Sequence, residues 1–263
     1  MKITALSSLC VDVYPELDEV YVGGNSLNFA TQCKLLGNND VSIIGAVGND
    51  QYGDLIEAHL HKLNIDYSNF YRLKDTTASN KIFIDRKGDR YFKEDSWNGG
   101  AFDAFRLSEN DWQTLSDSSI IAMPGGDPNL KELLKRKHEN QLVIIDFLDY
   151  IGIDVIKDHI DDINIVFLSG KEEQLDALKA LSFEKDKLIV ATLGAKGSVA
   201  FYDNTTYTQD AIATDTIIDT TGCGDAFQAT FVLEWYKHRD IKKALYQGAL
   251  VAKKVLGFVG GVE

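Results

Sequence analysis

The chain is poor in the residues that mark several common protein classes. Among its 263 residues there are three cysteines, and Cys10, Cys33 and Cys223 lie far apart, with no Cys-x-x-Cys pair. An odd number of widely spaced cysteines argues against a disulfide framework or a zinc site, so we expect reduced thiols in a cytoplasmic protein. The three prolines and the lack of a low-complexity run argue against a disordered linker.

Long apolar runs and positive charge are scarce as well. No window reaches transmembrane length, and the N-terminus lacks a basic region followed by a long apolar core, so no membrane partner is expected. With 27 Lys and Arg against 40 Asp and Glu, the net charge of −13 argues against nucleic acid as a partner. A nucleotide can still bind, because local N–H groups and a metal ion offset that charge.

Several catalytic signatures are missing. The chain has no G-x-x-x-x-G-K-[ST] loop, no G-x-G-x-x-G fingerprint and no HExxH pair, and its five histidines form no ligand cluster. The G-x-S-x-G elbow of serine hydrolases is absent too. Any phosphate site must therefore use another glycine loop.

Hydrophobic periodicity predicts an α/β fold. Strands alternate with helices most regularly in the second half, which implies a mostly parallel sheet covered on both faces, with ligands at the carboxyl ends of its strands. The strands are expected at 2–9, 41–47, 67–73, 120–123, 142–147, 163–168 and 188–192, and the helices at 26–37, 52–63, 130–136, 172–181, 225–237 and 241–256. A hairpin is expected at 198–208.

Two segments interrupt this alternation. Residues 12–22, and residues 76–98 with a hairpin between 78–84 and 90–92, could form a small separate sheet that serves as a lid on a single domain spanning 1–263. Their aromatic residues could stack on a ligand, pack against a second subunit's lid in a homodimer, or simply fill the small sheet; they are Tyr14, Tyr21, Tyr91, Phe92 and Trp97.

One loop carries chemistry of its own. Gly222 and Gly224 allow a tight turn whose N–H groups point into one concavity, and the apolar spacing that follows predicts a helix N-terminus, which attracts anions. Asp225 places a carboxylate beside that anion, a misfit unless it accepts a proton during the reaction. The loop thus suggests phosphoryl transfer to a hydroxyl with Asp225 as base, or, alternatively, Asp225 only caps the helix.

Three motifs together resemble the PfkB, or ribokinase-like, family of carbohydrate kinases. Gly23-Gly24-Asn25 with Asn28 is similar to the family's N-terminal signature, and residues 219–227, Asp-Thr-Thr-Gly-Cys-Gly-Asp-Ala-Phe, to its C-terminal one. Residues 192–197, Thr-Leu-Gly-Ala-Lys-Gly, are similar to its nucleotide loop. The resemblance implies a three-layer sandwich with a small β-sheet lid and an ATP-dependent transfer to a sugar hydroxyl.

The resemblance also implies roles for individual residues. Asp225 would be the base, and the N–H groups of Gly222, Cys223 and Gly224 would hold the transferred phosphoryl. The sugar hydroxyls would be bound by Asp12, Gly23, Gly24, Asn25 and Asn28, and ATP would lie along Thr192, Gly194 and Gly197. Glu172 would influence Mg²⁺ indirectly, and Asp219 with Thr221 would lie at a K⁺ site. Asp12 as a strand-end turn residue, Gly-Gly-Asn as an ordinary turn, and Glu172 as a solvated residue remain alternatives.

The sequence departs from the family at two positions. Ser169 stands where relatives usually have asparagine, and Asp146-Phe-Leu-Asp149-Tyr150 stands where they often have Asp-x-Asn-x-Arg. The exchange of an arginine for a carboxylate suggests a sugar that carries a cation, unless Asp149 is only a solvated loop residue. The opening CVDVYP, the short length and DFLD at 146–149 are most similar to bacterial fructoselysine 6-kinases.

These features lead to one main hypothesis and two alternatives. The main one is transfer of the γ-phosphoryl of ATP to the 6-hydroxyl of a fructosamine such as fructoselysine. The first alternative is a kinase for fructose, another small sugar or a nucleoside. The second is a catalytically silent sugar or nucleotide binder.

Overall fold

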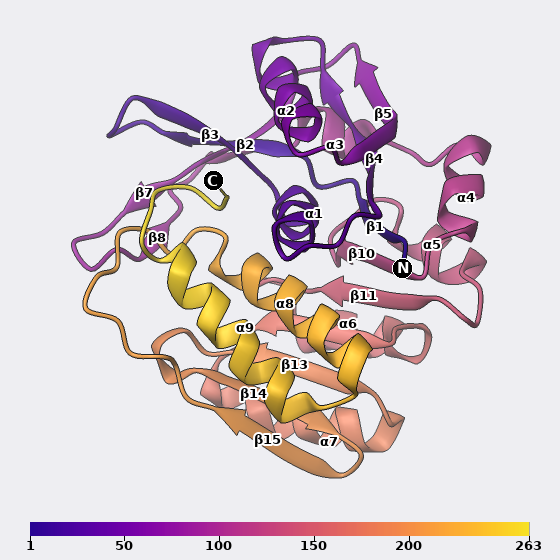
Figure 1. Cartoon of the computed structure of the whole chain (residues 1–263), viewed down its shortest axis with the longest axis vertical. Coiled ribbons are helices and arrows are strands. Elements are labelled where there is room, and N and C mark those ends of the chain that lie inside the picture. The colour runs from indigo at the N-terminus through magenta and orange to yellow at the C-terminus, as the bar shows by residue number, and fades with distance from the viewer. Residues whose placement is uncertain (263) are drawn as a thin grey trace.

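A central sheet of nine strands organises the computed structural model, which describes residues 1–262 (Figure 1). The strand order is β15-β14-β13-β12-β11-β10-β1-β4-β5; neighbours from β13 to β5 run parallel, and β14 and β15 are antiparallel. The strands are β1 (Ile3–Leu6), β4 (Val41–Gly48), β5 (Asp66–Leu73), β10 (Ile120–Pro124), β11 (Leu142–Asp146), β12 (Ile165–Ser169), β13 (Leu188–Thr192), β14 (Ser198–Tyr202) and β15 (Thr205–Gln209).

Apolar side chains alternate between the two faces of this sheet. In β12, for example, Ile165 and Phe167 join one core cluster, whereas Val166 and Leu168 join the other. Because successive side chains of a strand point to opposite faces, a continuous apolar run is what a strand buried on both sides needs. The predicted α/β sandwich is therefore confirmed, with one apolar core on each face.

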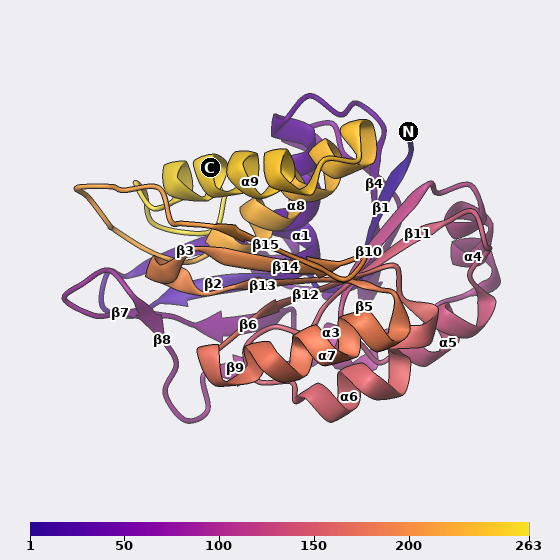
Figure 2. The same cartoon turned by 90° about the horizontal axis from the view of Figure 1, so that it is seen from below.

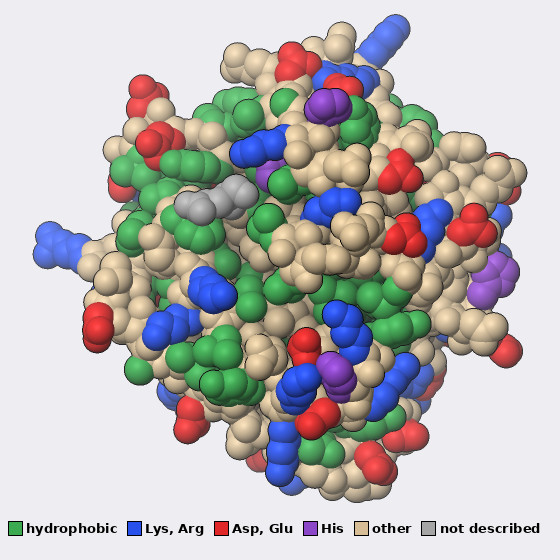
Figure 3. All heavy atoms as spheres, viewed as in Figure 1, with side chains coloured by type: hydrophobic (Ala, Val, Ile, Leu, Met, Phe, Trp, Pro, Cys, Tyr) green, Lys and Arg blue, Asp and Glu red, His purple; other side chains and the backbone are tan. Residues whose placement is uncertain are grey.

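Helices cover both faces, as Figure 2 shows. Helices α1, α8 and α9 lie on one side, and α3, α5, α6 and α7 on the other. Their bounds are α1 (Asn25–Leu35), α2 (Gln51–Lys62), α3 (Gly100–Ala104), α4 (Glu109–Ser116), α5 (Leu130–Arg136), α6 (Ile153–His159), α7 (Leu175–Lys185), α8 (Cys223–His238) and α9 (Ile241–Val255). Within residues 1–262, no helix has the length and apolar character that crossing a membrane requires. Acidic and basic side chains intermingle on the face shown in Figure 3.

A second sheet stands apart from the main one. Its order is β3-β2-β6-β9, formed by β3 (Glu19–Gly23), β2 (Cys10–Tyr14), β6 (Ala78–Lys81) and β9 (Trp97–Asn98). A further hairpin joins β7 (Phe83–Ile84) to β8 (Arg90–Tyr91). We call these six strands the small sheets; that they act as a lid stays a prediction.

Two strand expectations need correction. Residues 2–9 do not form one strand that ends at Asp12: β1 stops at Leu6, and a tight turn at Ser7 (φ 71°) directs the chain into β2, so that Asp12 lies in the middle of that strand. Likewise 78–84 is divided, because β6 pairs with β2 and β9 whereas β7 pairs with β8. Pairing partners, which periodicity does not reveal, decide both breaks.

Candidate active site

Side chains from three elements, α1, β11 and α8, converge at the carboxyl end of β11. Asn25 in α1 donates from Nδ2 to Asp146 Oδ2 (2.8 Å) and to Asp225 Oδ1 (2.7 Å). Asn28, one turn later in the same helix, donates to Asp225 Oδ2 (2.8 Å). Both carboxylate oxygens of Asp225 are thus held by amides that are more than 190 residues away in the sequence. The structure brings together Asn25, Asn28 and Asp225 as the sequence predicted.

The electrostatic environment adapts Asp225 to accept a proton near neutral pH. Burial, together with the negative charge of Asp146, raises the pKa of Asp225 to about 7. The Asn28 and Asn25 amides and the positive charge of Arg90 act in the opposite direction. A carboxylate with a pKa near the working pH is a suitable general base.

Asp12 lies against the turn that precedes α1. A Cβ at Gly23 would meet Asp12 Oδ2 at 2.2 Å, and a Cβ at Gly24 (φ 104°) would meet the Ser8 carbonyl oxygen at 2.5 Å. Gly24 must therefore be glycine, and a side chain at Gly23 would displace the Asp12 carboxylate, so the pair does more than form an ordinary turn. Burial raises the pKa of Asp12 to about 7, against the positive charge of Arg90. Asp12 is 5% exposed, and within residues 1–262 its carboxylate has no recorded hydrogen bond, which leaves it to bind ligand hydroxyls.

The predicted anion loop opens directly onto α8. Gly222 has a left-handed backbone (φ 74°) and forms the N-cap, and a Cβ there would lie 2.3 Å from Gly261 Cα. Gly224 differs from the expectation: it is already helical, and nothing in the described chain lies within 4 Å of a Cβ placed on it. The Cys223 N–H donates weakly to the Thr220 carbonyl (3.3 Å), whereas the Gly224 N–H has no recorded acceptor among residues 1–262.

The sequence suggested that ligand sites lie at the ends of strands, but this loop does not directly follow one. An irregular segment, 210–222, connects it to β15, and buried hydrogen bonds fix the end of that segment. Asp219 accepts from the Thr221 N–H and hydroxyl at one oxygen, and from the Tyr14 hydroxyl (2.6 Å) and the Gly260 N–H (2.9 Å) at the other. These four donors fill the acceptor sites of the carboxylate. The side chain therefore does not fit as a direct K⁺ ligand, and the K⁺ prediction is limited to backbone oxygens.

The predicted nucleotide loop lies two strands away on the same edge of the sheet. Thr192 ends β13 and pairs with Ser169, which ends β12. Gly194 (φ 57°) and Gly197 (φ 89°) give the loop its turns, and a Cβ at Gly197 would lie 2.0 Å from the Gln209 carbonyl oxygen. At the spacing of strands in a sheet, β13 is about 10 Å from β11, a distance that an extended nucleotide can cover.

Glu172 is engaged elsewhere. It lies in an exposed 3₁₀ turn (Glu172–Gln174) and forms an ion pair with Lys196 of the nucleotide loop. Among residues 1–262, no three His, Cys, Asp or Glu side chains are grouped so that they could hold a metal. Mg²⁺ would therefore be held mainly by nucleotide phosphates, with Glu172 acting at most through water.

Sequence reasoning gave no site role to several residues that the structure places here. Asp146 shares the Asn25 amide. Asn80 pairs with Asp12 across β6 and β2, so both side chains lie on one face, and its buried Oδ1, like that of Asn28, has no partner in the described chain. Arg90 acts on the pKa of both Asp12 and Asp225. No sequence signal marks Asn80 or Arg90, because strand pairing brings them to the site.

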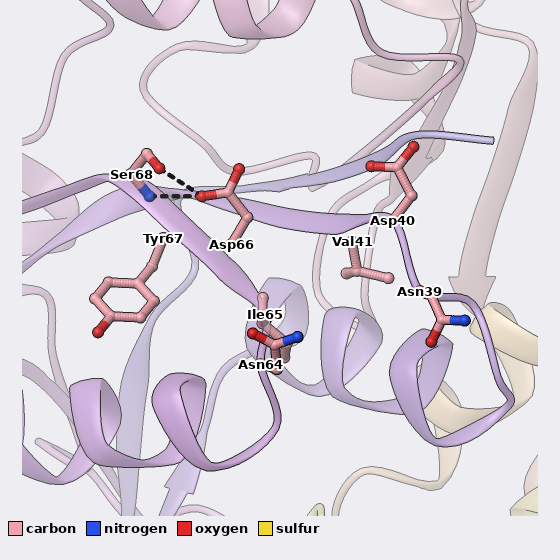
Figure 4. Close-up of a pocket in the computed structure, with 8 residues that line it drawn as sticks. All are labelled: Asn39, Asp40, Val41, Asn64, Ile65, Asp66, Tyr67 and Ser68. Carbon is pink, nitrogen blue, oxygen red and sulfur yellow. Dashed lines mark hydrogen bonds between the residues drawn. The ribbon is translucent and has the colours of Figure 1, made fainter.

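A separate pocket of about 450 Å³ lies elsewhere on the molecule (Figure 4). Its lining includes Asp40 and Val41, before and at the start of β4, and Asp66, at the start of β5. The amino ends of these parallel strands lie on the edge opposite Asp146. This pocket contains none of the predicted site residues.

Comparison with known proteins places the chain in a family. The pfkB family of carbohydrate kinases matches residues 11–262. The chain belongs to this family. It is therefore a phosphotransferase that acts on a sugar hydroxyl, as the sequence predicted.

Its relatives include kinases of several acceptors. The chain is 27% identical to fructoselysine 6-kinase of Escherichia coli, over 98% of each chain, and 30% identical to the fructosamine kinase of Bacillus subtilis, over 99% of this chain and 92% of the relative. Nucleoside kinases and fructokinases also match. Among solved structures, the nucleoside kinase of Methanocaldococcus jannaschii has a TM-score of 0.78 at 24% identity, covering 99% of this chain and 93% of that one. The ribokinase-like fold is thereby confirmed.

Proposed function

We propose that the protein transfers the γ-phosphoryl of ATP to the 6-hydroxyl of a fructosamine such as fructoselysine. The observation that carries the proposal is the placement of Asp225, in the first turn of α8 with both oxygens held by Asn25 and Asn28. A base and an anion site are then next to each other, and a hydroxyl held between them can be deprotonated as it attacks.

In the proposed step the sugar oxygen forms a bond to the γ-phosphorus. The bond from that phosphorus to the bridging oxygen breaks, ADP leaves with the electron pair, and Asp225 accepts the hydroxyl proton. The Gly224 N–H, which has no acceptor among residues 1–262, and the α8 dipole stabilise negative charge on the phosphoryl oxygens. Mg²⁺, when bound with ATP, offsets phosphate charge.

Acceptor groups around the sugar support a polyhydroxyl substrate. Asp12 is buried without a recorded partner in the described chain, and the Oδ1 atoms of Asn28 and Asn80 are unpaired there as well. A hydroxyl donor in the ligand would satisfy each of them, and its absence would leave a buried acceptor unpaired, at a cost of about 1–3 kcal/mol. This supports selection for several hydroxyl groups at fixed positions.

The fructosamine assignment rests on two further supports. The two fructosamine-type relatives match along nearly the whole chain. Asp149 is exposed three residues beyond Asp146, and its charge raises the pKa of that carboxylate, so negative charge extends outward from the site. A substrate with a cationic tail would be attracted there.

Two variants test the role of Asp149. Asp149→Asn should raise KM for fructoselysine, leave kcat unchanged and leave KM for fructose unchanged. Asp154→Asn is the matched control, because its carboxylate is 96% exposed on α6. An unchanged KM for fructoselysine with intact kcat would remove Asp149 from substrate binding.

An acceptor screen tests the proposal itself. ADP release should be measured with fructoselysine, fructose-asparagine, fructose and nucleosides, and the phosphorylated carbon located by NMR. We expect the highest kcat/KM with a fructosamine, phosphorylated at carbon 6. Strong turnover of free fructose or a nucleoside, with none of any fructosamine, would favour the alternative kinase.

A base variant distinguishes a kinase from a silent binder. Asp225→Asn should lower kcat by about 10²–10⁴-fold while the fold is kept. Asp215→Asn, at an exposed position in the 210–222 segment, is the control. Activity that survives unchanged in Asp225→Asn would refute the mechanism.

The small sheets also offer a surface for a homodimer. Several apolar side chains on their strands and in the adjoining turns are at least 37% exposed, namely Leu17, Val20, Tyr91, Phe92 and Trp97. We propose that a second copy covers them. Sedimentation of the wild type and of Trp97→Glu tests this: a monomeric wild type excludes the dimer, and a dimer that persists in Trp97→Glu places its interface elsewhere.

A further inference from the structure

The β7–β8 hairpin is fastened to the segment that leads into the anion loop. The Arg90 N–H donates to Thr220 Oγ1 (3.0 Å), and the Thr220 N–H donates to the Gly88 carbonyl (3.2 Å). Gly88 (φ 86°) lies so close to Ile217 that a Cβ would be 2.6 Å from its Cγ2. The Arg90 backbone is therefore held against Thr220, which precedes Gly222 by two residues. In the sequence, 130 residues separate Arg90 from Thr220.

The Arg90 side chain is uncommitted. It is exposed, its guanidinium lies over the Phe92 ring at 5.6 Å, and no carboxylate within residues 1–262 is recorded within ion-pair distance of it. Its positive charge nevertheless lowers the pKa of Asp12, Asp225 and the Cys223 thiol. The charge of the guanidinium thus acts on the sugar site, the base and the anion loop, and the backbone hydrogen bonds to Thr220 hold the residue beside that loop.

The site needs a positive charge at this place. Asp12, Asp146 and Asp225 bring three carboxylates to a site that, on the proposed function, must also accept a triphosphate. Among residues 1–262, the positive charge of Arg90 lowers the pKa of each of the three. A guanidinium is planar, stays charged and can donate two parallel hydrogen bonds to phosphate oxygens.

From this placement we infer that Arg90 is a catalytic residue that donates to the oxygens of the phosphoryl group in transit between ATP and the sugar. The inference rests on the proposed kinase activity and not on the identity of the sugar. Charge spreads over the equatorial phosphoryl oxygens as the bond to ADP breaks and the bond to the sugar forms. The α8 N-terminus would bind that charge from one side and Arg90 from the side of the hairpin.

The test compares Arg90→Met and Arg90→Lys with a control on the same hairpin. Arg86→Met removes an exposed positive charge from its turn. Steady-state kinetics should use the acceptor that wild type turns over fastest. Calorimetry should measure the affinities for Mg·AMP-PNP and Mg·ADP, each with that acceptor present, because only the first ligand carries a γ-phosphoryl group.

We expect Arg90→Met to lower kcat by about 10²-fold, with little change in KM for the sugar. It should lose most of the wild-type preference for AMP-PNP over ADP, Arg90→Lys should be intermediate, and Arg86→Met should match wild type. Melting temperatures of all three variants should equal that of wild type. A merely structural role for Arg90 would not change the preference for AMP-PNP.

Three outcomes overturn the inference. If Arg90→Met raises only KM for the sugar, the guanidinium binds the acceptor instead. If Arg90→Met behaves like Arg86→Met, the Arg90 side chain contacts neither substrate. If wild type neither transfers phosphoryl nor binds AMP-PNP, the kinase proposal fails first and the role of Arg90 fails with it, whereas the first two outcomes leave the kinase intact.

Discussion

Asp146 and Asp225 share one hydrogen-bond donor, so replacing Asp146 tests whether Asp225 is the base. Asn25 Nδ2 is 2.8 Å from an oxygen of Asp146 and 2.7 Å from an oxygen of Asp225. The two oxygens are therefore no more than about 5.5 Å apart, the total of these distances. Asp146→Asn removes a negative charge from this position and leaves the Asn25–Asp225 hydrogen bond possible.

The size of the effect follows from Coulomb's law. Two unit charges about 5.5 Å apart interact by about 3 kcal/mol at an effective dielectric constant of 20. That equals about two pKa units, and solvent at the edge of these mostly buried carboxylates reduces it, so we expect a shift of about one unit. Because the lost charge is negative, the ionised form of Asp225 becomes easier to form and its pKa falls from about 7.

The assay is the pH dependence of kcat/KM between pH 5 and 9, which reports groups of the free enzyme. Wild type should lose activity below pH about 7, because a protonated Asp225 cannot accept the hydroxyl proton. Asp146→Asn should move this acid limb to lower pH by about one unit. It also leaves one of two donors, Leu148 N–H or Asn25, without an acceptor, so unfolding free energy should fall by about 1 kcal/mol.

An acid limb that stays in place, or moves to higher pH, in a folded Asp146→Asn would refute this reasoning. Asp12 also has a pKa raised to about 7, but Asp146 is not among the charges that act on it, so its titration cannot produce the shift. The exposed Asp154→Asn again serves as control, with an unchanged profile expected.

Three further predictions concern the walls of the site. Tyr14→Phe leaves one oxygen of buried Asp219 with one donor fewer and should lower unfolding free energy by about 1–3 kcal/mol in urea titrations; no loss would contradict this. Gly222→Ala should lower Tm, because its Cβ would overlap the C-terminal backbone at Gly261. Gly224→Ala should keep the wild-type Tm and lower kcat. An equal loss of Tm in both variants would contradict this prediction. Asp12→Asn should raise Tm at pH 8 and not at pH 5. The raised pKa of Asp12 makes the folded state bind an extra proton between pH about 4 and 7, so wild-type stability falls as pH rises through that window. A change in Tm that is the same at both pH values would contradict this.

Features set by local sequence could be predicted. Helix α5 has the predicted bounds, Leu130–Arg136, because apolar spacing and flanking polar residues act over one or two turns. The alternation of buried strands with helices was sufficient to predict the α/β sandwich. The anion loop was found because Gly222 and Asp225 lie within one turn of the helix they open.

Features set by pairing between distant segments could not be predicted. The reach of Asn25 to both Asp146 and Asp225 joins positions more than 120 residues apart. Arg90 lies beside the anion loop because a hairpin of two-residue strands is held by Thr220, and no periodicity marks such short strands. Gly224 was assigned to the turn itself, although Gly222 alone supplies the left-handed backbone, because both glycines look alike in sequence.

Residues from both ends of the chain contribute to the site. Tyr14 from β2 and the Gly260 N–H bind the same oxygen of Asp219, and the Gly261 backbone lies against both Gly222 and the Asn28 amide. The first strands of the small sheets, the anion loop and the C-terminal segment therefore support one another through buried contacts over more than 200 residues. Since contacts of such long range form only when the intervening sheet is folded, Asp225 acquires its raised pKa and its oriented oxygens together with the whole fold.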